Sequence, residues 1–306
     1  MSGNVAIFGP HPLLTITIEQ RQNAGDEIHI HAGGQGVWVS RMVGELGGQP
    51  ILCGFIGGET GATLEPLLEW LPGERRFVRS AEASGCYVQD RRSGERTLVS
   101  AAWSDNPSRH ELDDLFSVTV AAALESDVLV ICNPMPPGVL PLELYRNLAS
   151  DVRANGTPVL VDLSTPRLDS ALAAEPDLVK LNDWELAEFV RGPVGAPSEL
   201  RGAAERVRDA GAGTVVVTRG GAPAFVLHGD EAWELVPPHF DGGAHEGCGD
   251  SMMGGLAAAW ANGCDWQTAL RRGAAAGAAN FLRHGLGTGS RAVVEELVND
   301  VRLQPL

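Results

Sequence analysis

Four short apolar segments in the second half of the chain, most of them followed by a helical segment, constrain the fold more than any other feature. The segments are "DVLVICN", "PVLVDLS", "LVKLN" and "TVVVT", and nearly every side chain in them is apolar. A strand that is apolar on both faces must be covered on both faces, and alternating strands and helices are typical of a parallel sheet between helices. The sequence therefore predicts an α/β fold with a mostly parallel central sheet.

Two segments do not fit this sheet. Residues 26–32 alternate between apolar and polar side chains, and residues 86–100 have the pattern of a hairpin. Alternation is typical of strands with one exposed face. We expect these segments to form a small β lid, at about 12–32 and 84–101, on a single domain that spans residues 1–306.

Charge and cysteine content exclude several classes of partner. The chain has 39 acidic and 23 basic residues, a net charge of −16, which disfavours binding to nucleic acid or to an anionic membrane. Its five cysteines form no CxxC pair and show no zinc-ligand spacing, as in reduced cytoplasmic proteins. The N-terminus lacks the features of a signal peptide, and no apolar run is long enough to span a membrane. We therefore expect a cytoplasmic protein that binds small molecules.

The segment Gly247-Cys248-Gly249-Asp250 stands immediately before a run of helix-forming residues. Glycines let the backbone approach a ligand closely, and the first turn of a helix offers unpaired N–H groups and a positive dipole. Such a turn is a natural seat for an anion. An aspartate there is either a helix N-cap or a base beside a group that carries negative charge. Taken alone, the N-cap is the simpler interpretation.

Three other motifs lie where strands meet turns or helices. "AGGQG" (32–36) stands between the alternating strand and a helix, "KLNDWEL" (180–186) joins a strand end to a helix start, and "VVVTRGG" (215–221) ends a strand on two glycines. Each has a plain structural interpretation on its own, as a glycine turn or a helix cap. Their order and spacing along the chain are more specific than any one of them.

In that order and spacing, the chain resembles the ribokinase-like carbohydrate kinases of the PfkB type, most closely the phosphofructokinase and tagatose-6-phosphate kinase branch. The resemblance covers nearly the whole chain and is carried by stretches such as "AGGQGVWVSRMVGELGG", "PMPPGVLPLELY", "VVVTRGGAPAF" and "GCGDSMMGGLAAAW". It implies a ribokinase-like three-layer sandwich with a mostly parallel central sheet and a small β lid. It also implies a kinase that uses ATP and Mg²⁺ to phosphorylate a hydroxymethyl group of a sugar or sugar phosphate.

The resemblance implies a role for each matching residue. Asp250 would be the catalytic base, and the N–H groups of Gly247, Cys248 and Gly249 would form an anion hole. The nucleotide site would contain Asn182, Glu185, Thr218, Gly220 and Asn280. Glu185 would meet the Mg²⁺–phosphate end largely through water. The acceptor site would contain Gly33, Gly34, Gln35 and Trp38.

Departures from the family pattern cluster on the acceptor side. Leu13 stands where an aspartate that grips sugar hydroxyls is expected, Gln35 where lysine or glycine is usual, and Trp38 where asparagine is usual. The hairpin position of a phosphate-binding arginine in phosphofructokinases aligns loosely with Ala83. Since leucine and tryptophan do not replace the lost hydrogen bonds, we expect an unusual acceptor. Trp38 either stacks on a sugar face or a base, or packs in the core.

Two alternatives remain open at this point. A nucleoside kinase of the same fold would be favoured if Trp38 faces the cleft. A non-catalytic relative that binds a metabolite is the other, although the retention of Asp250 between its glycines and the helix argues against it. Lids of this family often pair between subunits, so we expect a homodimer through the β lid. His11, His29 and His31 are candidates for acceptor contacts, with exposed lid histidines as the simpler expectation.

Overall fold

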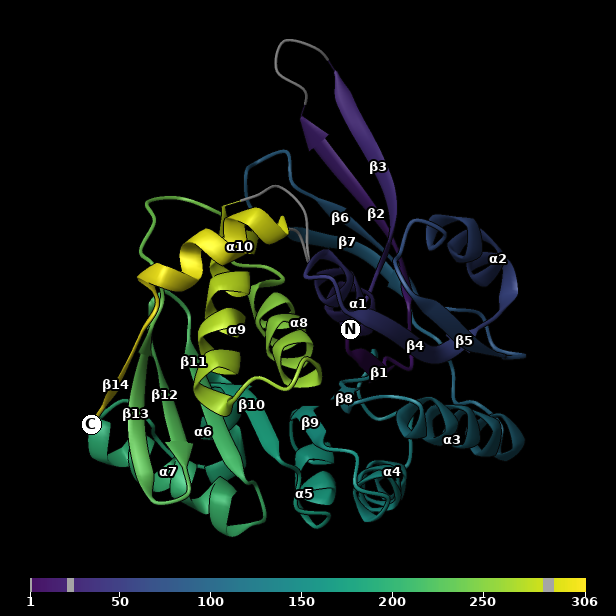
Figure 1. The fold of residues 1–306 in the computed structure, drawn as a ribbon. Coiled ribbons are helices and arrows are strands. Elements are labelled where there is room, and N and C mark those ends of the chain that lie inside the picture. The colour runs from purple at the N-terminus through teal and green to yellow at the C-terminus, as the bar shows by residue number, and fades with distance from the viewer. Residues whose placement is uncertain (1, 21–24, 283–288) are drawn as a thin grey trace.

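The computed structural model describes residues 2–20, 25–282 and 289–306, and its centre is a ten-stranded sheet (Figure 1). The strands follow the order β14-β13-β12-β11-β10-β9-β8-β1-β4-β5 across the sheet. The parallel strands are β1 (Asn4–Phe8), β4 (Gln49–Ile56), β5 (Glu74–Arg79), β8 (Val128–Cys132), β9 (Val159–Asp162), β10 (Leu178–Asn182) and β11 (Thr214–Arg219). The antiparallel strands at one end are β12 (Ala222–His228), β13 (Glu231–Val236) and β14 (Arg302–Pro305).

Helices cover both faces of this sheet. One face carries α1 (Gln35–Glu45), α2 (Gly58–Leu67), α8 (Cys248–Ala261), α9 (Trp266–Phe281) and α10 (Arg291–Leu297). The other carries α3 (Arg109–Leu124), α4 (Leu142–Ala154), α5 (Arg167–Leu172), α6 (Asp183–Val190) and α7 (Pro197–Asp209). Ile7 of β1 packs into the first core and its neighbour Phe8 into the second, because successive side chains of a strand point to opposite faces. The predicted three-layer α/β fold is confirmed, and none of the described helices is long and apolar enough to cross a membrane.

A second, four-stranded sheet projects beyond the main sheet at the top of Figure 1. Its strands, in the order β3-β2-β6-β7, are β2 (Leu13–Gln20), β3 (Asp26–Gly33), β6 (Cys86–Asp90) and β7 (Thr97–Ala102). We call this sheet the lid. The hairpin predicted at 86–100 is the antiparallel pair β6–β7. Residues 21–24, within the first predicted lid segment, lie outside the described residues.

Strands β5 and β14 were not expected from the sequence. They form the two edges of the large sheet, and their sequences "ERRFVR" and "RLQP" contain no apolar run. An edge strand has a neighbour on one side only and need not be apolar on both faces, so periodicity gives little sign of it.

The first turn of α1 packs directly on the end of β1. A Cβ atom added to Gly36 would lie 2.6 Å from Gly9 Cα, and one added to Gly9 would lie 2.7 Å from Gly36 Cα. Only glycine at both positions permits this backbone approach. The contact places the preceding residue, Gln35, at the carboxyl ends of the central strands.

Replacing Gly36 by alanine is expected to destabilise the fold by about 1–3 kcal/mol, because the added methyl group must push α1 away from β1. The matched control is Gly202→Ala in α7, where an added Cβ meets no atom within 4 Å. That change should stabilise the protein by about 0.5–1 kcal/mol through helix propensity. Urea unfolding midpoints measure both effects, and midpoints that move in the same direction would contradict the close α1–β1 contact.

Candidate active site

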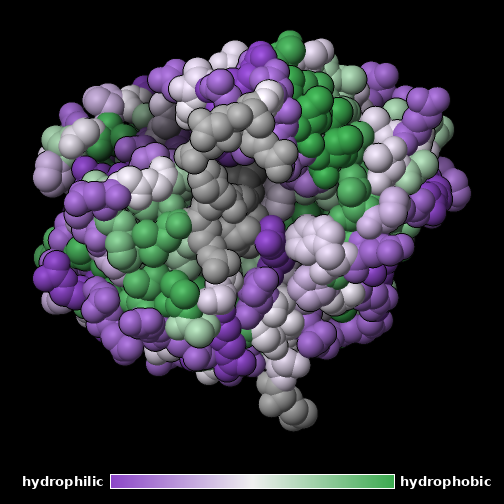
Figure 2. Space-filling model, turned by 90° about the horizontal axis from the view of Figure 1, so that it is seen from above, coloured by the Kyte–Doolittle hydropathy of each residue, from purple (hydrophilic) through white to green (hydrophobic). Residues whose placement is uncertain are grey.

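A cleft of about 1120 Å³ opens between the lid and the carboxyl ends of β8 to β11. Figure 2, which looks down on this side, shows a hollowed surface with apolar areas around it. Most of the predicted site residues line the cleft: Gly34, Gln35, Trp38, Asn182, Glu185, Thr218, Gly220, Gly247, Cys248, Gly249 and Asp250. Gly33 and Asn280 do not. The cleft is large enough for two small molecules, since single-ligand pockets usually measure about 300–1,000 Å³.

Asp250 lies in the first turn of α8, which begins with Gly247 as its N-cap in the left-handed conformation (φ 76°). The simpler interpretation of Asp250 as an N-cap is therefore wrong. The Cys248 N–H donates to the His245 carbonyl at 3.3 Å, whereas those of Gly249 and Asp250 meet no acceptor among the described residues. Unpaired N–H groups at a helix start favour a bound anion. Burial raises the pKa of the Cys248 thiol, which fits a packing role.

The Asp250 carboxyl group lies deep in the cleft, and its protonation is balanced near neutral pH. Burial and the nearby Asp162 carboxylate raise its pKa to about 7, against the opposing effects of Lys180 and the Gln35 side chain. A general base is most effective when its pKa lies near the working pH. The environment of Asp250 therefore suits proton abstraction.

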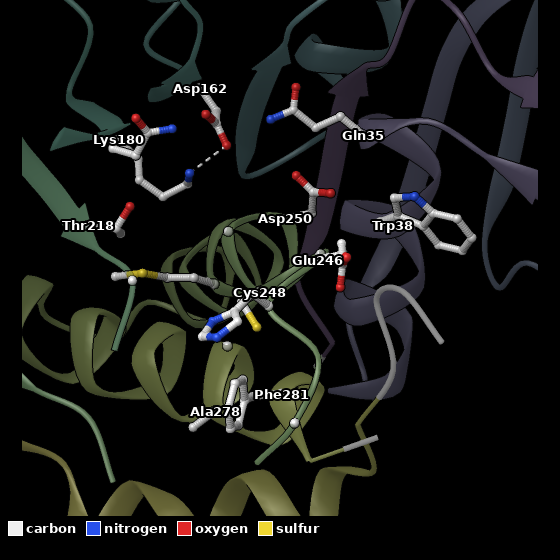
Figure 3. A pocket seen from close by; sticks show the side chains of 18 of the residues that line it. Gln35, Trp38, Asp162, Lys180, Thr218, Glu246, Cys248, Asp250, Ala278 and Phe281 are labelled. Atoms are coloured by element: carbon white, nitrogen blue, oxygen red, sulfur yellow. Dashed lines mark ion pairs between the residues drawn. The ribbon is translucent and has the colours of Figure 1, made fainter. Parts of the chain in front are cut away.

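Lys180 and Asp162 form a buried ion pair beside Asp250, and the sequence did not reveal it. The Lys180 Nζ lies 2.8 Å from Asp162 Oδ2, and each side chain is only 5% exposed (Figure 3). Burial alone would lower the pKa of Lys180, but the ion pair outweighs it and the pKa is raised. A Cβ atom on Gly249 would lie 3.4 Å from Lys180 Nζ, so the ammonium group stands at the start of α8. The signal in the sequence was a lysine inside the apolar segment "LVKLN".

Asn182 and Glu185 form a reciprocal cap at the start of α6. The Glu185 N–H donates to Asn182 Oδ1 and the Asn182 N–H donates to Glu185 Oε2, both at 2.8 Å. The structural interpretation of this motif is therefore correct, and both residues also line the cleft. Burial, together with Asp162, raises the pKa of Glu185. The cap uses one carboxylate oxygen of Glu185 and leaves the other without a partner among the described residues.

One end of the cleft is an apolar slot between the β11–β12 turn and α9. Its lining includes Leu235, Phe240, Ala274, Ala278 and Phe281, with Thr218 and Gly220 at the turn. Figure 3 shows Ala278 and Phe281 on α9 and Thr218 on the opposite wall. Asn280, which was predicted to lie near the adenine, does not itself line the cleft. Its side chain is fully buried and donates to the Glu246 carbonyl at 2.8 Å, so it anchors the loop before α8.

The other end lies under the lid and is rich in aromatic side chains. Trp38, Tyr87 and Trp103 line it together with Leu13, Leu98 and Met135. Arg96 lies over the Tyr87 ring, 5.4 Å from its centre, and donates to the Tyr87 hydroxyl at 2.9 Å. Arg96 forms no ion pair with any described residue. Sequence reasoning missed Arg96, which stands in a polar hairpin turn with two other arginines.

Two sequence predictions at this end need correction. Gly33 does not line the cleft, because it lies inside the lid, where an added Cβ would be 2.7 Å from Thr15 Oγ1. His11 is not an exposed lid histidine: it is 8% exposed and lines the cleft. Burial lowers its pKa to about 4, so the imidazole is neutral. Neither ring nitrogen has a hydrogen-bond partner among the described residues.

Comparison with known proteins identifies the family. The model of the pfkB family carbohydrate kinase matches residues 13–292 of this chain. The chain belongs to the pfkB family. Among its pfkB-type relatives, the ATP-dependent 6-phosphofructokinase isozyme 2 of Escherichia coli (strain K12) is 31% identical over 263 residues, covering 83% of this chain and 82% of that protein. The 1-phosphofructokinase of Rhodobacter capsulatus is 29% identical over 252 residues, covering 77% and 75%.

Solved structures agree with this assignment. The phosphofructokinase-2 of Escherichia coli in complex with potassium superposes with a TM-score of 0.84 at 26% identity, over 98% of this chain and 99% of that one. The predicted ribokinase-like fold is thereby confirmed. This pfkB-family chain is a carbohydrate kinase, a phosphotransferase that acts on an alcohol group of a sugar or sugar phosphate.

Proposed function

We propose that this pfkB-family kinase transfers the γ-phosphoryl group of ATP to a hydroxymethyl group of a phosphorylated sugar, with Asp250 as the general base. One observation carries the proposal. A partly buried carboxyl group, Asp250, stands beside the unpaired N–H groups of α8 and the Lys180 ammonium, where the two ends of one cleft meet. Phosphoryl transfer to a hydroxyl group needs a base next to an anion-binding site.

The residues around this point have different roles in the reaction. Asp250 takes the proton from the acceptor hydroxyl as its oxygen attacks. The N–H groups of Gly249 and Asp250 then stabilise the charge on the phosphoryl group in transfer, and Lys180 neutralises part of it. Cys248 was predicted to contribute its N–H to the anion hole, but that N–H already donates to the His245 carbonyl, so we assign Cys248 and the left-handed Gly247 the role of shaping this turn. Closure of the lid would exclude water and so protect ATP from hydrolysis.

The nucleotide and its metal ion fit the residues at the other end of the cleft. The apolar slot, with Thr218 and Gly220 at its edge, suits an adenine ring. The unused oxygen of Glu185 can accept a hydrogen bond from water bound to Mg²⁺. The described residues hold no cluster of acidic, histidine or cysteine side chains that could chelate a metal directly, which suits an ion held mainly by water and phosphate. When bound, Mg²⁺ would neutralise charge on the phosphate groups.

Arg96 supports a phosphorylated acceptor. It supplies a guanidinium group, free of carboxylate partners in the described part of the chain, to the lid end of the cleft. Guanidinium groups bind phosphate with paired hydrogen bonds. In a chain with net charge −16, such a cation at this end favours an anionic group on the acceptor.

The test is ADP release with Mg-ATP across fructose 1-phosphate, fructose 6-phosphate, tagatose 6-phosphate, free sugars and nucleosides. We expect turnover on a phosphorylated ketose, with KM for it raised about tenfold or more in Arg96→Gln. The matched control is Arg92→Gln on the same hairpin, since Arg92 pairs with Asp90 and Asp26 and does not line the cleft. Turnover on free sugars alone, with KM unchanged by Arg96→Gln, would contradict a phosphorylated acceptor.

Trp38 favours a second candidate function, a nucleoside kinase. Its side chain lines the cleft, although it is only 6% exposed and its ring lies 6.0 Å from that of His31. An indole can stack on a nucleobase as well as on a sugar face. Turnover on a nucleoside, and on no phosphorylated sugar of the panel, would select this function.

We also propose a homodimer that pairs through the lid. Ile28 and Ile30 of β3 are 63% and 53% exposed, and Leu98 and Val99 of β7 are each 58% exposed. Several exposed apolar side chains on one small sheet indicate that another protein surface covers them. A second copy of the same sheet is the natural partner, because a twofold axis pairs a patch with itself.

Replacing Ile30 by lysine is expected to convert the dimer into a monomer, because the new charge would be buried in the interface. The matched control is Leu124→Lys, at the end of α3 and away from the lid, where the wild-type side chain is 51% exposed. Sedimentation velocity at micromolar concentration measures both. A wild-type monomer, or a dimer that persists in Ile30→Lys, would contradict this interface.

A further inference from the structure

The side chain of Asn133 is held in one orientation by its neighbours. Asn133 follows β8, and its Oδ1 accepts hydrogen bonds from the Ser164 N–H at 3.1 Å, the Ser164 hydroxyl at 3.3 Å and Arg167 Nε at 3.3 Å. A backbone N–H and a guanidinium N–H can only donate, so these contacts identify the amide oxygen. Half a turn of the amide would place its NH₂ group against these donors.

The guanidinium group that holds Asn133 is itself buried. Arg167 is only 4% exposed and also donates to the Ser164 hydroxyl at 2.6 Å. In the described part of the chain its hydrogen bonds go to these neutral groups and not to a carboxylate. A buried positive charge beside Oδ1 polarises the amide and makes its NH₂ group a stronger donor.

The NH₂ group of Asn133 has no hydrogen-bond partner among the described residues. Asn133 lines the cleft, and the buried polar atoms that lack a partner in the described part of the chain all belong to other residues. Nδ2 is therefore open to the cleft rather than enclosed in the core. Ligand sites are built from a few polar groups held in fixed directions, and this neutral donor suits an oxygen atom of a ligand.

Asn133 stands near the reacting end of the acceptor site. Its N–H donates to Gln35 Oε1 at 2.7 Å, and Gln35 begins α1, which packs on α8. Asp250 lies in the first turn of α8, and Figure 3 shows Gln35 and Asp250 facing the same part of the cleft. Arg96, the proposed phosphate ligand, comes from the lid hairpin instead. This placement favours a contact with the sugar rather than with its phosphate group.

Resting on the proposed phosphorylated-sugar acceptor, we propose that Asn133 is a specificity-determining residue. Its NH₂ group donates to a hydroxyl or ring oxygen of the sugar, close to the hydroxymethyl group that is phosphorylated. Leu13, where an aspartate that grips sugar hydroxyls was expected, has no polar side-chain atom to offer. Asn133 therefore supplies a hydrogen bond on the side where the family pattern is lost. An acceptor without an oxygen at this point would leave a polarised donor unpaired and would be rejected.

Two substitutions remove the donor in different ways. Asn133→Asp keeps an oxygen for Ser164 and Arg167 and places a second oxygen where the NH₂ group was. Asn133→Ala removes the whole amide without adding charge. The matched control is Asn106→Asp, at an exposed residue that also precedes a proline and does not line the cleft. Isothermal titration calorimetry measures the Kd of the phosphorylated ketose that the wild type prefers and the Kd of Mg-ATP, and thermal unfolding tests the fold.

We expect the Kd of the acceptor to rise about tenfold in Asn133→Ala and at least as far in Asn133→Asp, with the Kd of Mg-ATP unchanged. The Asp variant should fold at least as stably as the wild type, because its carboxylate can pair with Arg167. It therefore gives an answer even if the Ala variant fails to fold. An acceptor Kd unchanged in the folded Asn133 variants would overturn the inference.

Inorganic phosphate, used as a competitor of the acceptor, tells a sugar contact from a phosphate contact. Its inhibition constant should stay the same in Asn133→Ala and rise in Arg96→Gln, because only Arg96 is assigned to the phosphate group. A loss of phosphate affinity in Asn133→Ala as large as the loss of acceptor affinity would overturn the assignment of Asn133 to the sugar.

Equilibrium binding also separates this inference from the proposed function. If the wild type binds no phosphorylated sugar of the panel, the proposed acceptor class fails and this inference fails with it. If the wild type binds one and the folded Asn133 variants bind it equally well, only the role of Asn133 is wrong.

Discussion

Replacing Asp250 by asparagine is expected to remove nearly all kinase activity and, at the same time, to stabilise the folded protein. Positioned base catalysis contributes about 10²–10⁴-fold to a rate, so kcat should fall by that factor. Stability should rise because the folded protein holds this carboxyl group at a pKa of about 7, against 3.8 in the unfolded chain. Burying the ionised form costs up to about 4 kcal/mol, which the neutral amide avoids.

The sign of this effect depends on pH in a defined way. Because the folded pKa lies above the unfolded one, the wild type loses stability as pH rises from about 4 to about 7, and the full loss is present above pH 7. Asp250→Asn should therefore melt several degrees higher at pH 8, and its advantage should shrink towards pH 4. Asp151→Asn, at an exposed site on α4, should change neither property. An Asp250→Asn variant that melts lower than wild type at pH 8 would contradict the raised pKa.

Replacing Lys180 by methionine is expected to destabilise the fold by about 3–5 kcal/mol, because it leaves the buried Asp162 carboxylate without a counter-charge. The Asp250 and Glu185 carboxylates lie near enough to raise the cost further. Urea unfolding at pH 8 measures the change. Kinase activity should be lost as well, since the ammonium group stands where the phosphoryl group is transferred.

Two controls isolate the charge effect of Lys180. The double variant Lys180→Met/Asp162→Asn should recover much of the lost stability, because the unpaired charge is gone. Arg201→Met removes an exposed ion pair with Glu205 at 3.0 Å and should change stability little. A double variant as unstable as Lys180→Met would mean that packing of the lysine stem, rather than its charge, holds this part of the site.

The sequence motifs correctly predicted two parts of the site whose geometry depends only on local structure. The turn before α8 and the cap of α6 are each contained in one short segment, so their residue types indicate their geometry. The long strands of the sheet were predicted for the same reason, since burial on both faces leaves a continuous apolar run. Position within a helix was less well predicted. Asn280 does not itself line the cleft and instead donates to the Glu246 carbonyl, whereas Ala278 and Phe281 line the cleft.

The contacts that join distant segments were beyond sequence reasoning. Gln35 and Asn133 are separated by 98 positions, and no local pattern in either segment indicates that they meet. Lys180 and Asp162 end or interrupt apolar strands, a sign of buried charge, but their pairing depends on β9 and β10 being neighbours. Arg96 lines the cleft because the lid strands β6 and β7 pair as a hairpin and position it there. Tertiary register, rather than residue type, decides such contacts.

The most direct measurement of the central claim is the single-turnover rate of phosphoryl transfer, by rapid quench, in wild type and Asp250→Asn with bound Mg-ATP and saturating acceptor. Single turnover isolates the chemical step from binding and product release. We predict equal ATP binding in the two proteins and a transfer rate at least about 100-fold lower in Asp250→Asn. Equal transfer rates would contradict the account, because Asp250 would then not be the group that takes the proton.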